Sequence, residues 1–254
     1  HTNRAYLDAL AARILVFDGA LGTNLQRLEL TAEDFGGERY AGCNDYLVLQ
    51  KPAAVESVHA AFLEAGCDVI ETCTFRANRL TMAEYGLEDD VPEINRAAAA
   101  LARGVAARFS TPERPRFVAG SLGPSGKLPS SSDPELSQIH FEELADVFRE
   151  QAAALIGGGC DLLLIETSQD LLEVKAAIMG VRHAFAETGV RLPLQVQVTL
   201  DVSGRMLLGT DVAAVLAALE RMPVDVLGLN CSTGPEHMQA ALAYLGERCT
   251  LPLS

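Results

Sequence analysis

Short apolar segments rich in branched side chains recur along the chain, each followed by a polar or glycine-containing cluster and a longer stretch of helical periodicity. Six complete apolar segments are expected to be β-strands, and they span residues 14–17, 68–72, 116–120, 161–166, 194–200 and 224–230. A seventh could begin at Leu251. The pattern predicts an α/β protein in which strands and helices alternate.

The stretches between these segments predict helices. One has Pro52 in its first turn and ends at Gly66, because proline suits the first helical position and glycine the residue after the last. Further helices are expected from Pro92, from Phe141 and from Leu171, the last of them ending at Gly189. His59 falls within the first helix and is expected to be exposed or to cap a helix end.

Strands that alternate with helices imply a parallel sheet, and nearly unbroken apolar strands imply that both faces of it are buried. A doubly wound sheet and a barrel both satisfy this pattern. Barrels of this type build their sites from residues at the carboxyl ends of many strands. Polar residues follow nearly every predicted strand, namely Asp18, Glu71, Thr72, Ser121, Glu166, Asp201, Asn230 and Cys231. A barrel is therefore favoured, and the G-x-G-x-x-G of a nucleotide-binding sheet does not follow the first strand.

The composition of the chain argues against nucleic acids and membranes as partners. The chain is 49% hydrophobic and carries a formal net charge of −14, which would repel nucleic-acid backbones and anionic lipid surfaces. No apolar stretch reaches the roughly 20 residues that span a bilayer, and the opening residues do not resemble a signal peptide. The six cysteines contain no C-x-x-C pair. We expect a cytoplasmic protein with reduced thiols, no nucleic-acid or membrane partner, and one domain.

Two acidic residues and one loop are candidates for ligand binding. Glu166 follows four apolar residues and Glu71 occupies the analogous place in an earlier strand, so both carboxylates should emerge at one rim. Such a pair suits a cationic ligand or acid–base catalysis, but structural ion pairs are equally compatible. The loop from Asp18 through Gly19 to Gly22 would let backbone amides approach a small ligand, or it is a plain tight turn.

Cys231 is the most informative cysteine. It lies at the end of a predicted strand beside a polar loop, where a thiol can ligate a metal or act as a nucleophile, although most lone cysteines are inert core residues. Cys73 also lies just past a strand end.

Eight ordered motifs span nearly the whole chain. They lie at 17–26, 42–52, 68–78, 84–95, 117–127, 165–177, 195–211 and 228–238, and include FDGALGTNLQ, DVIETCTFRAN, IETSQDLLEVKAA and GLNCSTGPEHM. Together they resemble the homocysteine S-methyltransferase family, and in particular the homocysteine-binding module of cobalamin-dependent methionine synthases.

The resemblance implies a (β/α)8 TIM-type barrel that binds one zinc ion through three cysteines, with the sulfur of homocysteine as the fourth ligand. It implies zinc-dependent methyl transfer to homocysteine, which gives methionine. The expected methyl donor is methylcobalamin on a separate module, reloaded from a methyltetrahydrofolate-binding module; some relatives use betaine or S-methylmethionine directly. Zinc suits this chemistry because it deprotonates a thiol whose pKa is otherwise about 8.5.

The family pattern also assigns residues by position. Cys231, the cysteine of GLNC, is implied as a zinc ligand and as the catalytic residue. The substrate-binding residues implied by the resemblance are Asp18, Gly19, Ala20, Phe75, Glu166 and Asn230. Glu166 is implied as the partner of the substrate ammonium group.

Two features depart from the family pattern. The family's other two zinc ligands form an adjacent Cys-Cys pair near the eighth strand, and no such pair occurs here. We therefore expect residues 1–254 to form a C-terminally incomplete barrel, present through about the sixth or seventh strand and inactive alone. A non-catalytic fragment that keeps part of the homocysteine pocket is the alternative. Cys73 stands where relatives more often carry a polar residue without a thiol, and it could be a substitute ligand.

Overall fold

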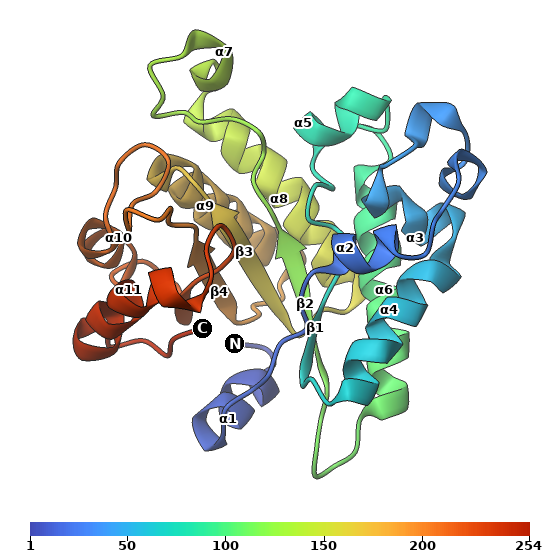
Figure 1. Ribbon diagram of the computed structural model, residues 1–254, viewed down its shortest axis with the longest axis horizontal. Coiled ribbons are helices and arrows are strands. Elements are labelled where there is room, and N and C mark those ends of the chain that lie inside the picture. The colour runs from blue at the N-terminus through green and yellow to red at the C-terminus, as the bar shows by residue number, and fades with distance from the viewer.

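The computed structural model describes residues 1–254, and its centre is a five-stranded sheet in the order β1-β2-β3-β4-β5 (Figure 1). The strands are β1 (Val69–Glu71), β2 (Phe117–Leu122), β3 (Leu162–Ser168), β4 (Leu194–Val198) and β5 (Val226–Leu229). All four pairings are parallel. Parallel neighbours require long crossover connections, which the helices provide. The predicted α/β class and parallel sheet are confirmed.

Single β-bridges continue the sheet beyond both of its edges. Phe17 pairs with Val69 of β1, and Leu253 pairs with Leu227 of β5, both in parallel orientation. The segments predicted as the first and seventh strands therefore occupy the expected places in the sheet order. Each forms one bridge instead of a strand.

An open seam lies between these two edge segments. Residues of both, including Phe17 and Leu253, line one cavity along it. Ile14 is 87% exposed and Val16 is 54% exposed, since no strand or helix covers them. The sheet thus curves like the wall of a TIM barrel with one side open, which is the partial barrel predicted from the sequence.

Helices surround the sheet (Figure 1). The long ones are α4 (Pro52–Ala65), α6 (Val91–Phe109), α8 (Phe141–Gly158), α9 (Leu171–Thr188) and α11 (Pro235–Arg248). Shorter α-helices are α1 (Ala5–Ala12), α2 (Leu21–Gln26), α3 (Leu47–Gln50), α5 (Arg79–Met82), α7 (Pro134–Ser137) and α10 (Val212–Leu219). Short 3₁₀ turns are η1 (Ala32–Phe35), η2 (Glu38–Tyr40), η3 (Asn44–Tyr46) and η4 (Ala83–Tyr85). All four predicted helices are present.

Two glycines end helices, and a third allows two helices to come close together. Gly66 and Gly189 follow α4 and α9 in the left-handed conformation, with φ of 109° and 69°, as predicted. On α9, a Cβ atom at Gly180 would lie 2.3 Å from the carbonyl oxygen of Ala145 on α8. The absence of a side chain at Gly180 therefore lets α8 and α9 pack closely against each other.

His59 on α4 is fully buried, so the prediction of an exposed or capping side chain is wrong. Its place in the helix explains the burial, because Val55 and Leu63 lie four residues before and after it on the same face. That face packs toward α6. Neither ring nitrogen has a hydrogen-bond partner. No helix in the chain is long and apolar enough to cross a membrane.

Candidate functional site

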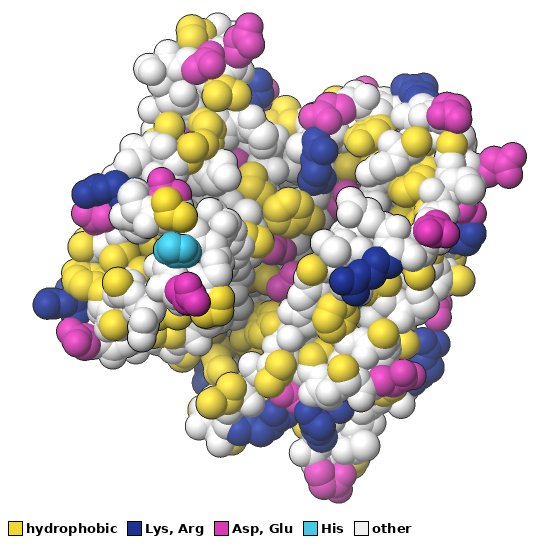
Figure 2. All heavy atoms as spheres, in the orientation of Figure 1, with side chains coloured by type: hydrophobic (Ala, Val, Ile, Leu, Met, Phe, Trp, Pro, Cys, Tyr) yellow, Lys and Arg dark blue, Asp and Glu magenta, His cyan; other side chains and the backbone are white.

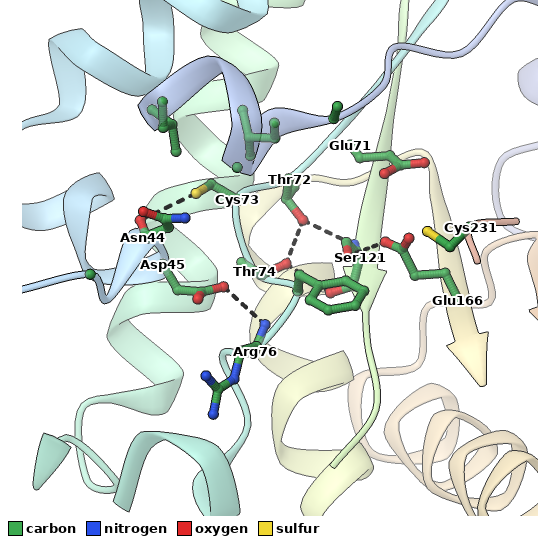
Figure 3. A pocket seen from close by; sticks show the side chains of 16 residues that line it. Asn44, Asp45, Glu71, Thr72, Cys73, Thr74, Arg76, Ser121, Glu166 and Cys231 are labelled. Atoms are coloured by element: carbon green, nitrogen blue, oxygen red, sulfur yellow. Dashed lines mark hydrogen bonds between the residues drawn. The ribbon is translucent and has the colours of Figure 1, made fainter. Parts of the chain in front are cut away.

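A cavity of about 270 Å³ opens at the carboxyl ends of the strands (Figure 3). Its lining consists of Ala20, Leu21, Gly22, Leu25, Gly42, Asn44, Asp45, Glu71, Thr72, Cys73, Thr74, Phe75, Arg76, Ser121, Glu166 and Cys231. Figure 2 shows the hollowed face of the molecule, with acidic side chains visible in the central hollow. Residues far apart in sequence therefore meet at the end of the barrel where this fold places its sites.

Most of the predicted site residues lie at this cavity. Four of them line it, namely Ala20, Phe75, Glu166 and Cys231. Asn230 lies beside the lining and donates a hydrogen bond from Nδ2 to Glu166 Oε2 at 3.1 Å. Phe75 is 39% exposed, so its ring forms part of the open wall.

Asp18 and Gly19 lie next to the cavity without lining it. Both carboxylate oxygens of Asp18 lie 3.1 Å from the backbone nitrogen of Glu71, which donates to them. The backbone N–H of Asp18 donates to the carbonyl oxygen of Val69 at 2.9 Å. Asp18 thus joins the loop before α2 to the end of β1, and burial raises its pKa to about 8. Gly19 lies outside the cavity lining, whereas Ala20 is part of it.

Three carboxyl groups, those of Asp18, Glu71 and Glu166, lie near one another at this rim. Burial raises the pKa of all three, and repulsion from Glu166 and Asp18 raises the pKa of Glu71 further. Arg76 is the one basic residue of the lining, and its guanidinium donates outward to Glu84 at 2.8 Å. The cavity therefore holds excess acidic groups and suits a ligand that carries a cationic group.

The Glu166 carboxyl group is held at both oxygens. Ser121 Oγ donates to Oε1 at 2.5 Å, and Asn230 Nδ2 donates to Oε2. Asn230 in turn accepts the backbone N–H of Thr167 on its Oδ1 at 2.9 Å. Burial raises the pKa of Glu166, and the hydrogen bonds from Ser121 and Asn230 oppose that rise because they favour the ionised form.

The backbone at the end of β3 and after β5 is strained. Thr167, Cys231 and Ser232 have positive φ values of 57°, 59° and 62°, in a region that non-glycine residues rarely adopt. The register between β3 and β4 also shifts between Ile165 and Ser168. Thr167 Oγ1 lies 3.5 Å from Cys231 Sγ as a hydrogen-bond donor. Such strain persists where surrounding contacts enforce it, and it is common at functional sites.

The residues of this chain do not by themselves make a zinc site. No group of three or more His, Cys, Asp or Glu side chains is placed to hold a metal ion. Cys231 is an exposed thiol at the cavity and fits the role of one thiolate ligand. Cys73 is buried, and its Sγ donates to the carbonyl oxygen of Asn44 at 3.3 Å. Burial raises the pKa of the Cys73 thiol, which disfavours the thiolate that zinc requires.

The family model described as homocysteine S-methyltransferase matches residues 15–254. The chain belongs to the homocysteine S-methyltransferase family. Its curated relatives include the methionine synthases of Mycobacterium leprae and Mycobacterium tuberculosis, each 40% identical over 248 residues. Those alignments cover 98% of this chain and 20% of each relative, so the chain spans about a fifth of their length. The predicted family resemblance is confirmed.

Solved structures of one bacterial enzyme have the same fold. The metallated form of the homocysteine methyltransferase MmuM from Escherichia coli matches with a TM-score of 0.78 and 25% identity, covering 97% of this chain and 84% of that one. Its apo form matches with a TM-score of 0.74 and 26% identity, covering 97% and 83%. This homocysteine S-methyltransferase domain therefore has the partial TIM-barrel fold of a homocysteine methyltransferase.

Several lining residues were not predicted as part of the site. Asn44 and Asp45 lie in the 3₁₀ turn η3, and Arg76 lies in the loop between β1 and α5. The sequence indicated only that Ser121 is a polar residue after a predicted strand, and it did not assign Ser121 to the site. Its β2 position pairs with Leu164 of β3, which brings its hydroxyl to Glu166 two residues further along.

Proposed function

We propose that this domain binds homocysteine and activates it for methyl transfer to its sulfur, giving methionine, as one module of a cobalamin-dependent methionine synthase. The observation that carries the proposal is the convergence of Glu166 and Cys231, from β3 and from the loop after β5, on one acidic cavity. Membership of the homocysteine S-methyltransferase family and 40% identity to two methionine synthases support it.

The cavity chemistry matches the two ends of homocysteine. Glu166 offers a carboxylate to the ammonium group, and Glu71 places a second carboxyl group in the same lining as a hydrogen-bond acceptor. The turn at Gly19 and Ala20, which Asp18 anchors to β1, offers backbone amides to the substrate carboxylate. Phe75 covers the aliphatic carbons. In this orientation the substrate thiol points toward Cys231. Glu166, Asp18, Gly19, Ala20, Phe75 and Asn230 are the substrate-binding residues that we propose.

We further propose that a zinc ion binds at Cys231, with other ligands supplied by parts of the longer protein. The chain spans about a fifth of the related methionine synthases, which leaves room for such ligands and for cobalamin-binding and methyltetrahydrofolate-binding modules. When bound, zinc would deprotonate the substrate thiol at neutral pH. Within this chain, Thr167 and Asn230 orient Cys231 and Glu166, and the acidic residues bind the ammonium group.

A homocysteine methyltransferase with a different methyl donor is the second candidate. The match to MmuM favours this candidate. MmuM is described as a homocysteine methyltransferase, and the alignment covers 84% of its chain.

The full-length protein, purified without chelators, tests these proposals. We expect one zinc per chain by elemental mass spectrometry and methionine formation from homocysteine with methylcobalamin. Methionine formation only with betaine or S-methylmethionine would contradict the role in a cobalamin-dependent enzyme and support the second candidate. Absence of turnover with every donor, in zinc-loaded protein, would contradict the catalytic proposal.

A further inference from the structure

Ser121 on β2 is a buried hydroxyl that the proposed substrate contacts do not use. It is 1% exposed, and its Oγ donates to Glu166 Oε1 at 2.5 Å (Figure 3). We propose that Ser121 is a positioning residue, which holds the Glu166 carboxylate in the orientation that binds the ammonium group of the substrate. This inference rests on the proposal that Glu166 binds the substrate ammonium group. It adds that Ser121 orients the Glu166 carboxylate for that contact.

The backbone of Ser121 is fixed from two sides. Its N–H donates to Thr72 Oγ1 at 2.9 Å, and its carbonyl oxygen accepts Thr74 Oγ1 at 2.7 Å and Gln151 Nε2 at 3.4 Å. The hydroxyls of Thr72 and Thr74 lie 2.6 Å apart. The loop after β1 and helix α8 therefore set the place of Ser121, independently of any ligand in the cavity.

The hydroxyl of Ser121 is left with one partner, Glu166 Oε1. The other carboxyl oxygen, Oε2, accepts from Asn230 Nδ2. The orientation of the Asn230 amide is determined, because its Oδ1 accepts the backbone N–H of Thr167 and Nδ2 must then face Glu166. An NH2 group only donates, so Oε2 acts as an acceptor. Each oxygen thus has one donor, and two fixed points set the plane of the carboxylate.

A carboxylate held in this way presents its remaining lone pairs to the cavity. Without the Ser121 hydroxyl, Glu166 Oε1 loses its donor, and the carboxylate is free to rotate away from this orientation. The ammonium group would then meet a carboxylate in several orientations and lose part of a charge-assisted hydrogen bond. Groups of the ligand that do not contact Glu166 would be unaffected.

Two ligands separate this role from a merely structural one. L-homocysteine carries the ammonium group, whereas γ-mercaptobutanoate has the same thiol and carboxylate and no amino group. In the full-length protein with its zinc, we expect Ser121→Ala to weaken L-homocysteine binding about tenfold, the size of one lost hydrogen bond to a charged group. The affinity for γ-mercaptobutanoate should stay unchanged, as measured by calorimetry.

The chain offers a matched control. Ser125 is also buried, and its hydroxyl donates to the carboxyl group of Glu173, outside the cavity lining. Ser125→Ala removes the same atom from a comparable Ser–Glu pair and should change neither affinity. Ser121→Cys fills the place of the hydroxyl with a weak donor and should reproduce the selective loss of Ser121→Ala, which keeps the test open if the alanine variant folds poorly.

The outcomes distinguish this inference from the function on which it rests. Equal losses for the two ligands, or no loss for L-homocysteine, would overturn the role of Ser121. Glu166→Gln is measured in parallel. If it separates the ligands while Ser121→Ala does not, only the role of Ser121 is wrong; if Glu166→Gln fails to separate them, the ammonium role itself is wrong.

Discussion

Protonation of His59 should destabilise the folded domain in mild acid. The imidazole is fully buried with no hydrogen-bond partner, and burial lowers its pKa to about 4. In the unfolded chain a histidine titrates near pH 6.5, as a model peptide does. Because the folded-state pKa is depressed, protons bind the unfolded state more tightly. The stability contributed by neutral His59 is complete above about pH 6.5 and is lost as the pH falls toward 4.

The size of the effect follows from the pKa difference. A shift of about 2.5 units at roughly 1.4 kcal/mol per unit corresponds to about 3 kcal/mol once both states are protonated. Most of it, about 2 kcal/mol, should already be lost between pH 7 and pH 4.5. That amount is a large part of the stability of an ordinary domain.

Urea unfolding of the wild type and of His59→Leu, at pH 7 and at pH 4.5, measures this contribution. Leucine is apolar and of similar size, so the variant should lose less stability between the two pH values by about 2 kcal/mol. Buried carboxyl groups with raised pKa values, such as Asp45 and Glu173, add stability as the pH falls, but they are common to both proteins and cancel in the comparison. Equal pH dependence in both proteins would refute the reasoning.

Three further substitutions test the site and the fold. Cys231→Ala in the full-length protein should abolish zinc binding and methyl transfer while circular dichroism stays unchanged; retained zinc with normal turnover would rule out the ligand assignment. Glu166→Gln should weaken homocysteine binding tenfold or more and leave zinc content unaltered, so parallel losses of both would count against the ammonium role. Asp68→Ala should lower the free energy of unfolding by about 3 kcal/mol, because the buried Asp68 pairs with Arg13, Arg114 and Arg116; an unchanged urea midpoint would show that these pairs contribute little.

The sequence predicted most of the fold because the relevant signals are local. Short, mostly apolar segments marked all five strands, since a parallel strand covered on both faces is largely apolar. Gln195 and Gln197 in β4 are buried exceptions. Pro52 and Gly66 marked the ends of α4 because each residue constrains its own backbone.

Failures occurred where structure depends on a distant partner. Residues 14–17 have a strand-like sequence but form only one bridge, beside the open seam, because pairing depends on how this segment meets β1 and not on its own residues. His59 was wrongly expected at the surface, since the helical pattern around it does not say which face α6 will cover.

The sequence by itself determined the α/β class, the family, and the placement of Glu166 and Cys231 at strand ends, because these follow from chain order and local pattern. Only the tertiary structure decided that Ser121, Glu166 and Asn230 form one hydrogen-bonded group. Their contacts depend on the register of β2 against β3 and on the strained backbone at Thr167, and both are set by packing between segments far apart in the chain.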